Sequence, residues 1–349
     1  MRIIVTGGAG FIGSALIRHL IENTREKILN IDKLTYASSM ESLRDVSQSQ
    51  RYKFLDLDIC NMSALNAVFE EFKPEAVINL AAETHVDRSI SSPAVFIQTN
   101  IVGTFNLLEV TRVYLEKAEN HLVKKFRFLH VSTDEVFGDL PHPNYQMDAN
   151  ELKFTEKSAY APRSPYAATK ASSDVLVRAW QQTYGLPTLI TNSSNNYGEY
   201  QFPDKFIPRI ITNALRGKPL PVYGNGENIR DWLHVRDHAR ALYLVLTNGR
   251  IGESYNIGGN SERQNIDVVS IICDTLEILS ANRPSGTSRY SALIEFVDDR
   301  IGHDLRYAID TTKIETELSW QPEYQFEKGL IETIAWYINN QAWWKKLVV

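Results

Sequence analysis

Cysteine is scarce in this sequence. Its 349 residues include two cysteines, Cys60 and Cys273, which lie far apart and form no Cys-x-x-Cys pair. Zinc sites and disulfide frameworks need several cysteines at characteristic spacings, so the sequence favours neither. This usage fits a protein of the reducing cytoplasm, and we expect no metal site.

Long apolar runs and an excess of positive charge are also missing. The first apolar run meets Gly7 too early for a signal-peptide core, and no later run approaches membrane-spanning length. Lysine and arginine number 37 against 42 aspartates and glutamates, which gives a net charge of -5 without a basic stripe. We therefore expect no membrane and no nucleic-acid partner.

The sequence does contain a regular alternation of short β-rich runs and amphipathic helical patterns. The predicted strands cover residues 2–6, 28–32, 52–56, 76–80 and 126–132, and the predicted helices cover 11–23, 62–72, 94–117 and 165–184. Such a β-α-β repeat with right-handed crossovers predicts an α/β fold with a doubly wound parallel sheet, the Rossmann type.

The alternation stops after one further predicted strand at 188–192. Glycine, proline and asparagine cluster at 195–204 and 217–227, which predicts a second, smaller α/β lobe that binds the substrate. We expect residues 1–194 and 232–260 in a dinucleotide-binding domain, and 195–231 and 261–349 in the substrate-binding domain.

Glycines follow the first predicted strand directly, spaced G-x-x-G-x-x-G. Gly7 allows a tight turn, Gly10 lets the backbone approach a pyrophosphate, and Gly13 lets the helix pack closely on the strand. The amino end of that helix then faces the anion. The position of the motif between strand and helix predicts a dinucleotide site.

The second predicted strand ends in Asp32, about 20 residues beyond the glycines. A carboxylate there accepts hydrogen bonds from both hydroxyls of an adenosine ribose and repels a 2'-phosphate, so NAD is favoured over NADP. Lys33 keeps NADP open as an alternative, and Asp32 could instead only cap a turn. Asp58 and Ile59 could flank the adenine.

A tyrosine and a lysine, Tyr166 and Lys170, stand four residues apart in the predicted helix at 165–184. They share one helix face, where the lysine charge can lower the pKa of the tyrosine and make it a general base. The same spacing also occurs in ordinary amphipathic helices.

Three polar residues, Thr133, Asp134 and Glu135, follow the strand at 126–132. They lie at the carboxyl end of the predicted sheet, where doubly wound folds bind their ligands. A solvated turn is the alternative for such an acidic pair.

Together, the glycine turn, the Ser132-Thr133 pair and the Tyr-x-x-x-Lys helix resemble the extended short-chain dehydrogenase/reductase family over nearly the whole chain. Epimerases of that family usually carry a small or hydroxyl residue at the position of Asp134, and decarboxylases carry Ser then Glu. Thr133-Asp134-Glu135 followed by Val-Phe-Gly resembles the signature of the dTDP-glucose 4,6-dehydratases.

The resemblance implies conversion of dTDP-glucose to a 4-keto-6-deoxy sugar. Tyr166 would take the proton of the 4-hydroxyl while carbon 4 is oxidised by NAD, and the ketone would acidify the proton on carbon 5. Glu135 would remove that proton, and protonated Asp134 would donate to the departing 6-hydroxyl. The hydride would then return to carbon 6.

The resemblance also implies binding residues, supported by matching segments at 81–89, 195–198, 219–224 and 229–232. On the cofactor side these are Gly7, Gly10, Phe11, Ile12, Gly13, Asp32, Lys33, Leu34, Thr35, Asp58, Ile59, Leu80, Ala81, Ala82, Thr84, Thr99, Tyr166, Lys170 and Asn196. On the substrate side they are Thr84, Thr133 and Asn195 near the sugar, and Lys205, Phe206, Pro221, Val222, Tyr223, Arg230, Asn265, Asp299, Arg300 and His303 towards the nucleotide.

Two positions depart from the dehydratase pattern, which has proline where this chain has Glu199 and Ile301. Both border the expected nucleotide pocket, so the preferred base stays open. His234 and His238 have a spacing that a metal could use on a helix, but the third ligand is missing and we expect structural roles. Trp343 and Trp344 near the carboxyl end could touch a partner or pack on the chain.

Three alternatives remain. The enzyme could dehydrate a UDP- or GDP-hexose, or decarboxylate or epimerise one, although the paired acids argue against the last two. A sensor that binds NAD without catalysis is a third, and it would need no acid-base residues. The resemblance implies a homodimer through the helices that begin at Ala94 and Pro165, and Phe96, Val102, Leu107 and Leu108 fit two buried faces.

Overall fold

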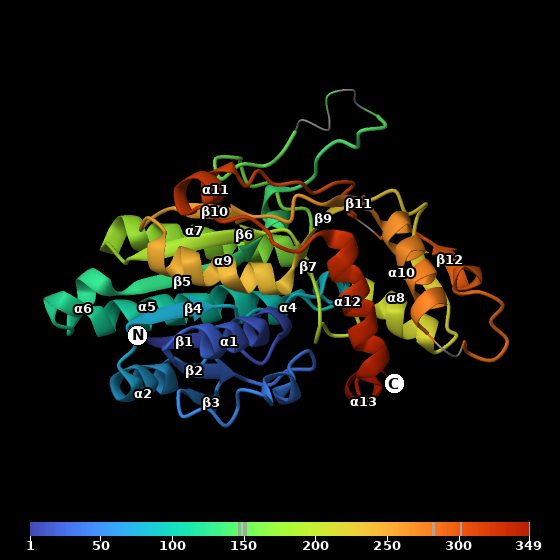
Figure 1. The fold of residues 1–349 in the computed structure, drawn as a ribbon. Coiled ribbons are helices and arrows are strands. Elements are labelled where there is room, and N and C mark those ends of the chain that lie inside the picture. The colour runs from blue at the N-terminus through green and yellow to red at the C-terminus, as the bar shows by residue number, and fades with distance from the viewer. Residues whose placement is uncertain (146–147, 149–151, 281–282, 301, 349) are drawn as a thin grey trace.

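A seven-stranded parallel sheet forms the centre of the molecule (Figure 1). The computed structural model describes residues 1–145, 148, 152–280, 283–300 and 302–348. The strand order is β10-β6-β5-β4-β1-β2-β3, and every neighbouring pair is parallel. Its strands are β1 (Arg2–Thr6), β2 (Lys27–Asp32), β3 (Tyr52–Asp56), β4 (Ala76–Asn79), β5 (Arg127–Thr133), β6 (Thr188–Ser193) and β10 (Ser254–Ile257).

Helices cover both faces of this sheet because its strands are apolar on both sides. In β1, Ile3 and Val5 pack in the core beneath helices α1 and α9, whereas Ile4 packs in the core beneath α2, α5 and α7. These helices are α1 (Phe11–Asn23), α2 (Met62–Phe72), α5 (Thr104–Glu116), α7 (Pro165–Tyr184) and α9 (Val235–Asn248). The predicted doubly wound fold is confirmed.

Helix α7 shows how local sequence fixes an element that carries site residues. The Ser164 side chain caps its start by accepting a hydrogen bond from the Ala167 amide, and Pro165 occupies the first turn. The helix ends at Gly185, whose φ of 67° is the left-handed conformation that glycine adopts at little cost. The observed bounds equal the predicted range 165–184.

The helix predicted at 94–117 is interrupted. It consists of α4 (Pro93–Phe96), a π-helical segment η2 (Ile97–Gly103) and α5. A π-turn contains one more residue than an α-turn and often marks a functional site. Here Thr99 and Asn100 are directed inwards: Thr99 Oγ1 accepts from Lys33 Nζ at 3.1 Å, and Asn100 Nδ2 donates to Thr169 Oγ1 at 2.9 Å.

A smaller lobe lies beyond the carboxyl end of the sheet (Figure 1). It contains the sheets β11-β9-β7 and β12-β8, and a separate core beneath α8, α10 and α12. Its strands are β7 (Asn195–Tyr197), β8 (Leu220–Tyr223), β9 (Ile229–His234), β11 (Glu262–Gln264) and β12 (Ile294–Val297), and its helices are α8 (Phe206–Leu215), α10 (Asn265–Leu279), α12 (Phe326–Asn339) and α13 (Gln341–Trp344).

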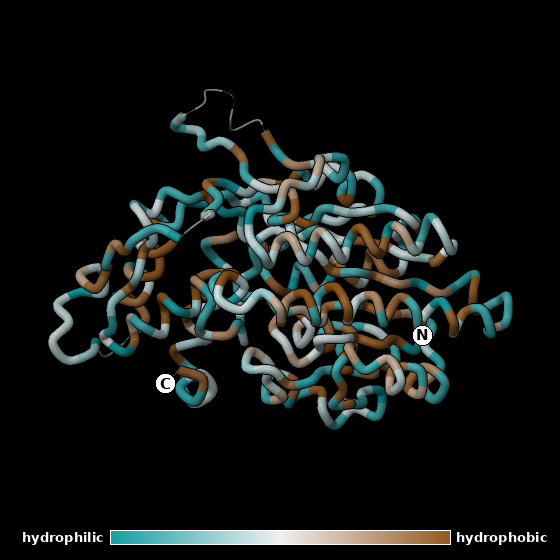
Figure 2. The backbone as a smooth tube through the Cα atoms, turned by 180° about the vertical axis from the view of Figure 1, so that it is seen from behind, coloured by the Kyte–Doolittle hydropathy of each residue, from teal (hydrophilic) through white to brown (hydrophobic). Residues whose placement is uncertain are grey.

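The remaining short helices connect these elements. They are η1 (Met40–Leu43), α3 (Val86–Ser91), α6 (Asn120–Lys125), η3 (Asp134–Phe137), η5 (Tyr290–Leu293) and α11 (Thr312–Leu318). Figure 2 shows apolar segments concentrated in the interior, with mostly hydrophilic outer loops. Trp343 and Trp344 are buried in the core of the smaller lobe, so these tryptophans pack on the chain itself.

The division into two domains stays a prediction. One segment packs in the core of the other predicted domain. Ile314 and Trp320, assigned by sequence to the substrate domain, are fully buried in the core beneath α1 and α9. Within the described residues, no helix is both long enough and apolar enough to cross a membrane.

Candidate active site

The glycine loop joins β1 to α1 at the carboxyl end of the sheet. Gly7 has a φ of 71°, and a Cβ atom there would stand 2.7 Å from the Ala81 amide nitrogen. A Cβ on Gly13 would come within 2.2 Å of the Gly7 carbonyl oxygen. Gly10 precedes α1 and offers no capping side chain, so the first amides of the helix are available to an anion.

Asp32 ties this loop to the end of β2. Its carboxylate accepts hydrogen bonds from the Ala9 amide at 3.0 Å, the Leu34 amide at 2.9 Å and the Ser38 hydroxyl at 3.0 Å. The bonds from Leu34 and Ser38 hold the turn after β2, in which Leu34 has a left-handed φ of 52°. Asp32 therefore does cap a turn, as the alternative interpretation expected. Asp32 also lines the adjoining cavity, where a ribose could meet it.

A cavity of about 290 Å³ runs from the glycine loop to the acid pair. Every residue predicted on the cofactor side lines it except Leu34. Of those predicted on the substrate side, Thr84, Thr133, Asn195 and Lys205 line it, together with Asp134 and Glu135. The arrangement fits a dinucleotide. A side chain at Gly7 or Gly13 would collide with neighbouring main chain, the first amides of α1 have no side-chain cap, and a carboxylate lies at the expected ribose position.

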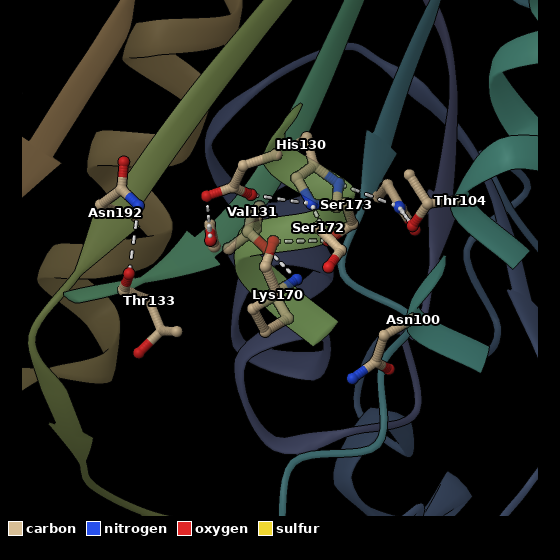
Figure 3. A network of polar contacts seen from close by, with 12 residues as sticks. Asn100, Thr104, His130, Val131, Thr133, Lys170, Ser172, Ser173 and Asn192 are labelled. Carbon is tan, nitrogen blue, oxygen red and sulfur yellow. Dashed lines mark hydrogen bonds and ion pairs between the residues drawn. The ribbon is translucent and has the colours of Figure 1, made fainter. Parts of the chain in front are cut away.

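The acid pair begins the 3-10 turn η3 directly after β5. The Thr133 side chain caps this turn by accepting from the Glu135 amide at 3.3 Å, and its carbonyl accepts from Asn192 Nδ2 at 3.1 Å (Figure 3). Asp134 is 1% exposed, and among the described residues no hydrogen-bond partner reaches its Oδ2 atom. Such an oxygen suits a protonated carboxyl group.

The two carboxyl groups have different surroundings. Burial and the charge of Glu135 raise the pKa of Asp134 well above its usual range. Burial also raises the pKa of Glu135, but Arg300, Arg230 and Lys205 oppose that shift. These surroundings favour the protonated form more strongly in Asp134 than in Glu135, which fits one proton donor and one acceptor.

Tyr166 and Lys170 face the same cavity from α7. The Lys170 ammonium donates to the Val131 carbonyl at 2.8 Å, and burial lowers its pKa to about 8 (Figure 3). The expected lowering of the Tyr166 pKa is wrong for this structure: burial, with Glu135, raises it, and a hydrogen bond with Thr133 opposes the rise. The spacing of Tyr166 and Lys170 along the helix carries no information on burial, and burial is the main cause of the raised pKa of Tyr166.

Lys205 and two asparagines, Asn195 and Asn196, line the expected sugar end of the cavity. Lys205 Nζ donates to the Thr84 carbonyl at 2.8 Å and joins the two lobes. Asn196 Oδ1 lies 2.8 Å from His238 Nδ1, so His238 orients a cavity residue. His234 caps α9 and stacks on Tyr324 with ring centroids 3.9 Å apart. Both histidines therefore have structural partners.

Apart from Lys205, the residues predicted for the nucleotide end lie outside the lining of the cavity, mostly in the smaller lobe. Arg230 donates to the Asp304 carbonyl at 2.9 Å and lies over the Tyr307 ring at 4.4 Å, while Arg300 pairs with Asp87 at 3.6 Å. The His303 ring packs edge-on against Tyr223. This cluster gives two cations and an aromatic ring on the same side as Glu135.

Four other residues predicted for the nucleotide end are absent from the cavity lining and have other surroundings. The Val222 side chain is buried in the core of the smaller lobe, so a ligand could meet only its backbone. Phe206 stacks on Trp232, and Pro221 lies in β8. Asn265 begins α10, and its amide donates to the Asn228 carbonyl at 3.0 Å.

Glu199, one of the two departures from the dehydratase pattern, lies outside the cavity. It is 8% exposed and pairs with Arg236 at 2.8 Å and Arg18 at 3.8 Å, which explains why a charged residue is tolerated there. Ile301 lies outside the described residues.

The sequence did not indicate several residues of the site. Glu83, Ser193, Ser194, Gln201 and Phe202 also line the cavity. Ser193 ends β6 and Ser194 follows it, at the same edge of the sheet as Thr133, so the rule for the carboxyl ends of strands could have found them. Nothing local marks Gln201 or Phe202.

Comparisons with known proteins show the family of this chain. A family model described as GDP-mannose 4,6 dehydratase matches residues 4–333. A dTDP-glucose 4,6-dehydratase of Escherichia coli is 57% identical over 349 residues, covering 100% of this chain and 96% of its own length. One from Neisseria meningitidis serogroup B is 57% identical over 347 residues, covering 99% and 96%.

Solved structures give the same result. DesIV, a dTDP-glucose 4,6-dehydratase from Streptomyces venezuelae with NAD and TYD bound, has a TM-score of 0.88 at 41% identity and covers 99% of this chain and 100% of its own. A UDP-glucose 4-epimerase from Thermotoga maritima with UDP-glucose has a TM-score of 0.82 at 26% identity, covering 98% and 100%. The chain therefore belongs to the extended short-chain dehydrogenase/reductase family. Within that family it belongs with the dTDP-glucose 4,6-dehydratases, as predicted.

Proposed function

We propose that this chain is an NAD-dependent hydro-lyase that converts dTDP-glucose to dTDP-4-keto-6-deoxyglucose and water. The observation that carries the proposal is the pair Asp134 and Glu135, adjacent in one cavity with Tyr166 yet held in different electrostatic surroundings. Relatives at 57% identity over the full chain bear the same activity as their name.

NAD would occupy the half of the cavity formed by the glycine loop and Asp32. Lys33, the residue that kept NADP open, lies 3.5 Å from Asp58 Oδ2 and donates to Thr99 Oγ1. Its charge is thus shared with a carboxylate beside the ribose position, which disfavours a 2'-phosphate. When bound, NAD supplies a reversible two-electron oxidation, first at carbon 4 and finally in reverse at carbon 6 of the sugar.

Tyr166 would act on the 4-hydroxyl. It is held in the cavity by α7, and its amide donates to Ser89 Oγ at 3.2 Å. Because the structure raises its pKa, the phenolate that accepts the proton depends on nearby positive charge, which Lys170 provides on the same helix face.

Glu135 and Asp134 would carry out the elimination. Glu135, facing Arg300, Arg230 and Lys205, takes the proton from carbon 5 once carbon 4 is a ketone. Asp134, whose pKa burial and Glu135 raise well above its usual range, gives its proton to the departing 6-hydroxyl, which leaves as water. Glu135 returns its proton to carbon 5 when carbon 6 is reduced, and the proton that Tyr166 took from the 4-hydroxyl replaces the one that Asp134 gave up, so the cycle balances.

The test is to incubate the purified chain with NAD and either dTDP-glucose or UDP-glucose. We expect the 4-keto-6-deoxy product, with loss of one water by mass, from dTDP-glucose and little from UDP-glucose. Equal turnover of UDP-glucose would favour the alternative substrate, which the relatives do not support. Bound NAD with no turnover of any nucleotide hexose would favour the sensor.

We further propose a homodimer. Phe96, Leu107 and Leu108, expected at two buried faces, pack in the chain's own core. Exposed apolar side chains on the neighbouring elements α4, η2, α5 and α7 leave a second face open: these are Val95, Ile97, Phe105 and Val175. Sedimentation of Val175→Asp should show a monomer, whereas Ile278→Asp, on the exposed face of α10, should sediment like the parent protein.

A cytoplasmic location is also proposed. It is supported by the unpaired Cys60 and Cys273, which fit a reducing compartment. Alkylation of both thiols in protein taken directly from cells under denaturing conditions would test it; blocked thiols would contradict it.

A further inference from the structure

A buried carboxylate that the proposed mechanism does not use lies one helical turn beyond Lys170. Asp174 is fully buried on α7. Its Oδ2 atom accepts from Ser132 Oγ at 2.8 Å and from Tyr160 Oη at 2.9 Å, and its Oδ1 atom lies 3.3 Å from His130 Nε2. Because burying an isolated charge is costly, a carboxylate in this position needs a balancing cation.

His130 does not provide that cation. Asn79 Oδ1 accepts from the Thr6 hydroxyl at 2.7 Å, so its Nδ2 donor faces His130 Nδ1 at 3.1 Å. His130 Nδ1 is therefore an acceptor, and the ring proton sits on Nε2, towards Asp174 and Ser173. Burial and the charge of Lys170 also lower the pKa of His130, which keeps the ring neutral.

Lys170 is the candidate for that cation. It is 4% exposed, and the hydrogen bond of its ammonium is to the carbonyl of Val131, between His130 and Ser132 on β5. Burial lowers its pKa to about 8, and the charge of Asp174 opposes this. The carboxylate and the ammonium lie on one helix face, four residues apart.

We propose that Asp174 is a positioning residue for the dehydration: its carboxylate balances the charge of Lys170 and, through Ser132, Tyr160 and His130, fixes α7 against β5. The bonds continue through Asn79 to Thr6, the last residue before the glycine loop. One buried chain of polar groups thus connects the cofactor loop to the helix that carries Tyr166. The inference rests on the proposed function, since it takes Tyr166 and Lys170 as groups that act on the sugar.

Other charged groups surround this helix and do not replace Asp174. Arg178 reaches Tyr160 Oη from the exposed side at 3.0 Å. The titratable groups on α7 and on the elements packed against it are Arg127 and His130 on β5, Asp134 and Glu135 on η3, Asp87 and Arg88 on α3, Glu109, Arg112, Tyr114 and Glu116 on α5, Tyr160 in the preceding loop, and Tyr166, Lys170, Arg178 and Tyr184 on α7 itself, besides Asp174. Asp87 pairs with Arg300, and Glu109 pairs with Arg112, so neither carboxylate forms an ion pair with Lys170.

The experiment compares pH profiles of kcat for the parent protein, Asp174→Asn and Asp174→Glu, with Ser172→Ala as a control on the exposed face of α7. Without the Asp174 charge, Lys170 loses its proton more easily, so the alkaline limb of Asp174→Asn should move to lower pH by about one unit. Asp174→Glu should restore its position, and Ser172→Ala should leave it unchanged. Activity lowered equally at all pH values, or no rescue by glutamate, would overturn the proposal.

A second measurement needs no substrate, so it separates this inference from the proposed reaction. A lysine whose pKa is about 8 in the folded protein and 10.5 in the unfolded chain makes the free energy of unfolding rise between those pH values, because the unfolded chain binds the proton more tightly. In Asp174→Asn this rise should begin at lower pH. A rise that begins where the parent's begins would refute the role of Asp174 even if dTDP-glucose is not the substrate.

The double variant Ser132→Ala with Tyr160→Phe serves if Asp174→Asn does not fold. It removes both donors to Asp174 Oδ2 and retains the side chain, so the carboxylate should no longer be fixed against β5 beside Lys170. The alkaline limb should again move to lower pH. A folded double variant with an unmoved limb would contradict the proposal.

Discussion

The proposed cofactor half and the proposed nucleotide half of this site are built by different means. Around the glycine loop, backbone atoms approach so closely that Cβ atoms on Gly7 and Gly13 would collide with neighbouring main chain. At the nucleotide end, side chains from distant segments hold one another: Arg230 lies over Tyr307 and donates to backbone carbonyls, and Arg300 pairs with Asp87. Changes in the first half should affect folding and cofactor binding together, and changes in the second mainly substrate affinity.

The largest effect is expected where the two halves meet, at the acid pair. Glu135→Gln should lower kcat at least about a hundredfold because it removes the base for carbon 5. Asp134→Asn should lower kcat similarly but leave Glu135 able to exchange the carbon 5 proton with solvent deuterium. Mass spectrometry of recovered sugar nucleotide checks this, and exchange lost in Asp134→Asn but kept in Glu135→Gln would reverse the assigned roles.

Gly7→Ala tests the cofactor half. Its Cβ would meet the Ala81 backbone at 2.7 Å, so we expect a loss of about 3 kcal/mol in unfolding free energy and weakened NAD binding. Gly185→Ala is a matched control, because its φ of 67° is close to the 71° of Gly7 and nothing lies within 4 Å of its Cβ position. It should cost about 1 kcal/mol in urea unfolding. Equal costs would mean that backbone conformation, not close approach, sets the requirement.

Arg230→Lys tests the nucleotide half. A lysine cannot make two parallel hydrogen bonds to a diphosphate, so KM for the sugar nucleotide should rise roughly tenfold or more with a smaller change in kcat. Arg263, opposite Arg230 in the β11-β9 ladder, pairs with Glu327, and Arg263→Lys should leave steady-state kinetics unchanged. A fall in kcat alone for Arg230→Lys would move this residue from binding to chemistry.

The last prediction concerns stability in acid, and its effect is absent at neutral pH. Burial lowers the pKa values of His234 and His238 to about 4 and about 3. Their stabilising neutral forms are fully present above the ordinary value of 6.5 and are lost as pH falls towards the lowered values, at about 1.4 kcal/mol per pH unit for each ring. Unfolding free energy should fall below pH 6.5, less steeply in His238→Asn. An equally steep fall in that variant would exclude His238 as a source.

The contrast between the halves also explains what could be predicted from sequence. The glycines, Asp32, Thr133 to Glu135 and the Tyr166-Lys170 pair occupy short contiguous segments at strand ends or in one helix, where local spacing carries the information. The strands β1 to β6 of the large sheet were predicted to within a residue at each end for the same reason.

Features that depend on distant contacts were not predicted. The network of Asp174, His130 and Asn79 joins three elements, and no local pattern marks Asp174 as different from other polar helix residues. Val222 was expected at the ligand, yet tertiary packing directs it into the core. The raised pKa of Tyr166 follows from burial, which the i, i+4 spacing does not report.

The π-helical segment from Ile97 to Gly103 makes chain length itself a constraint. Removing one residue there would turn it into an ordinary α-helix and rotate everything on one side of the cut by about 100° relative to the other. Thr99 and Asn100 would no longer meet Lys33 and Thr169, and Phe105 would leave the exposed apolar face. During evolution, this helix should therefore accept point substitutions far more often than deletions of a single residue.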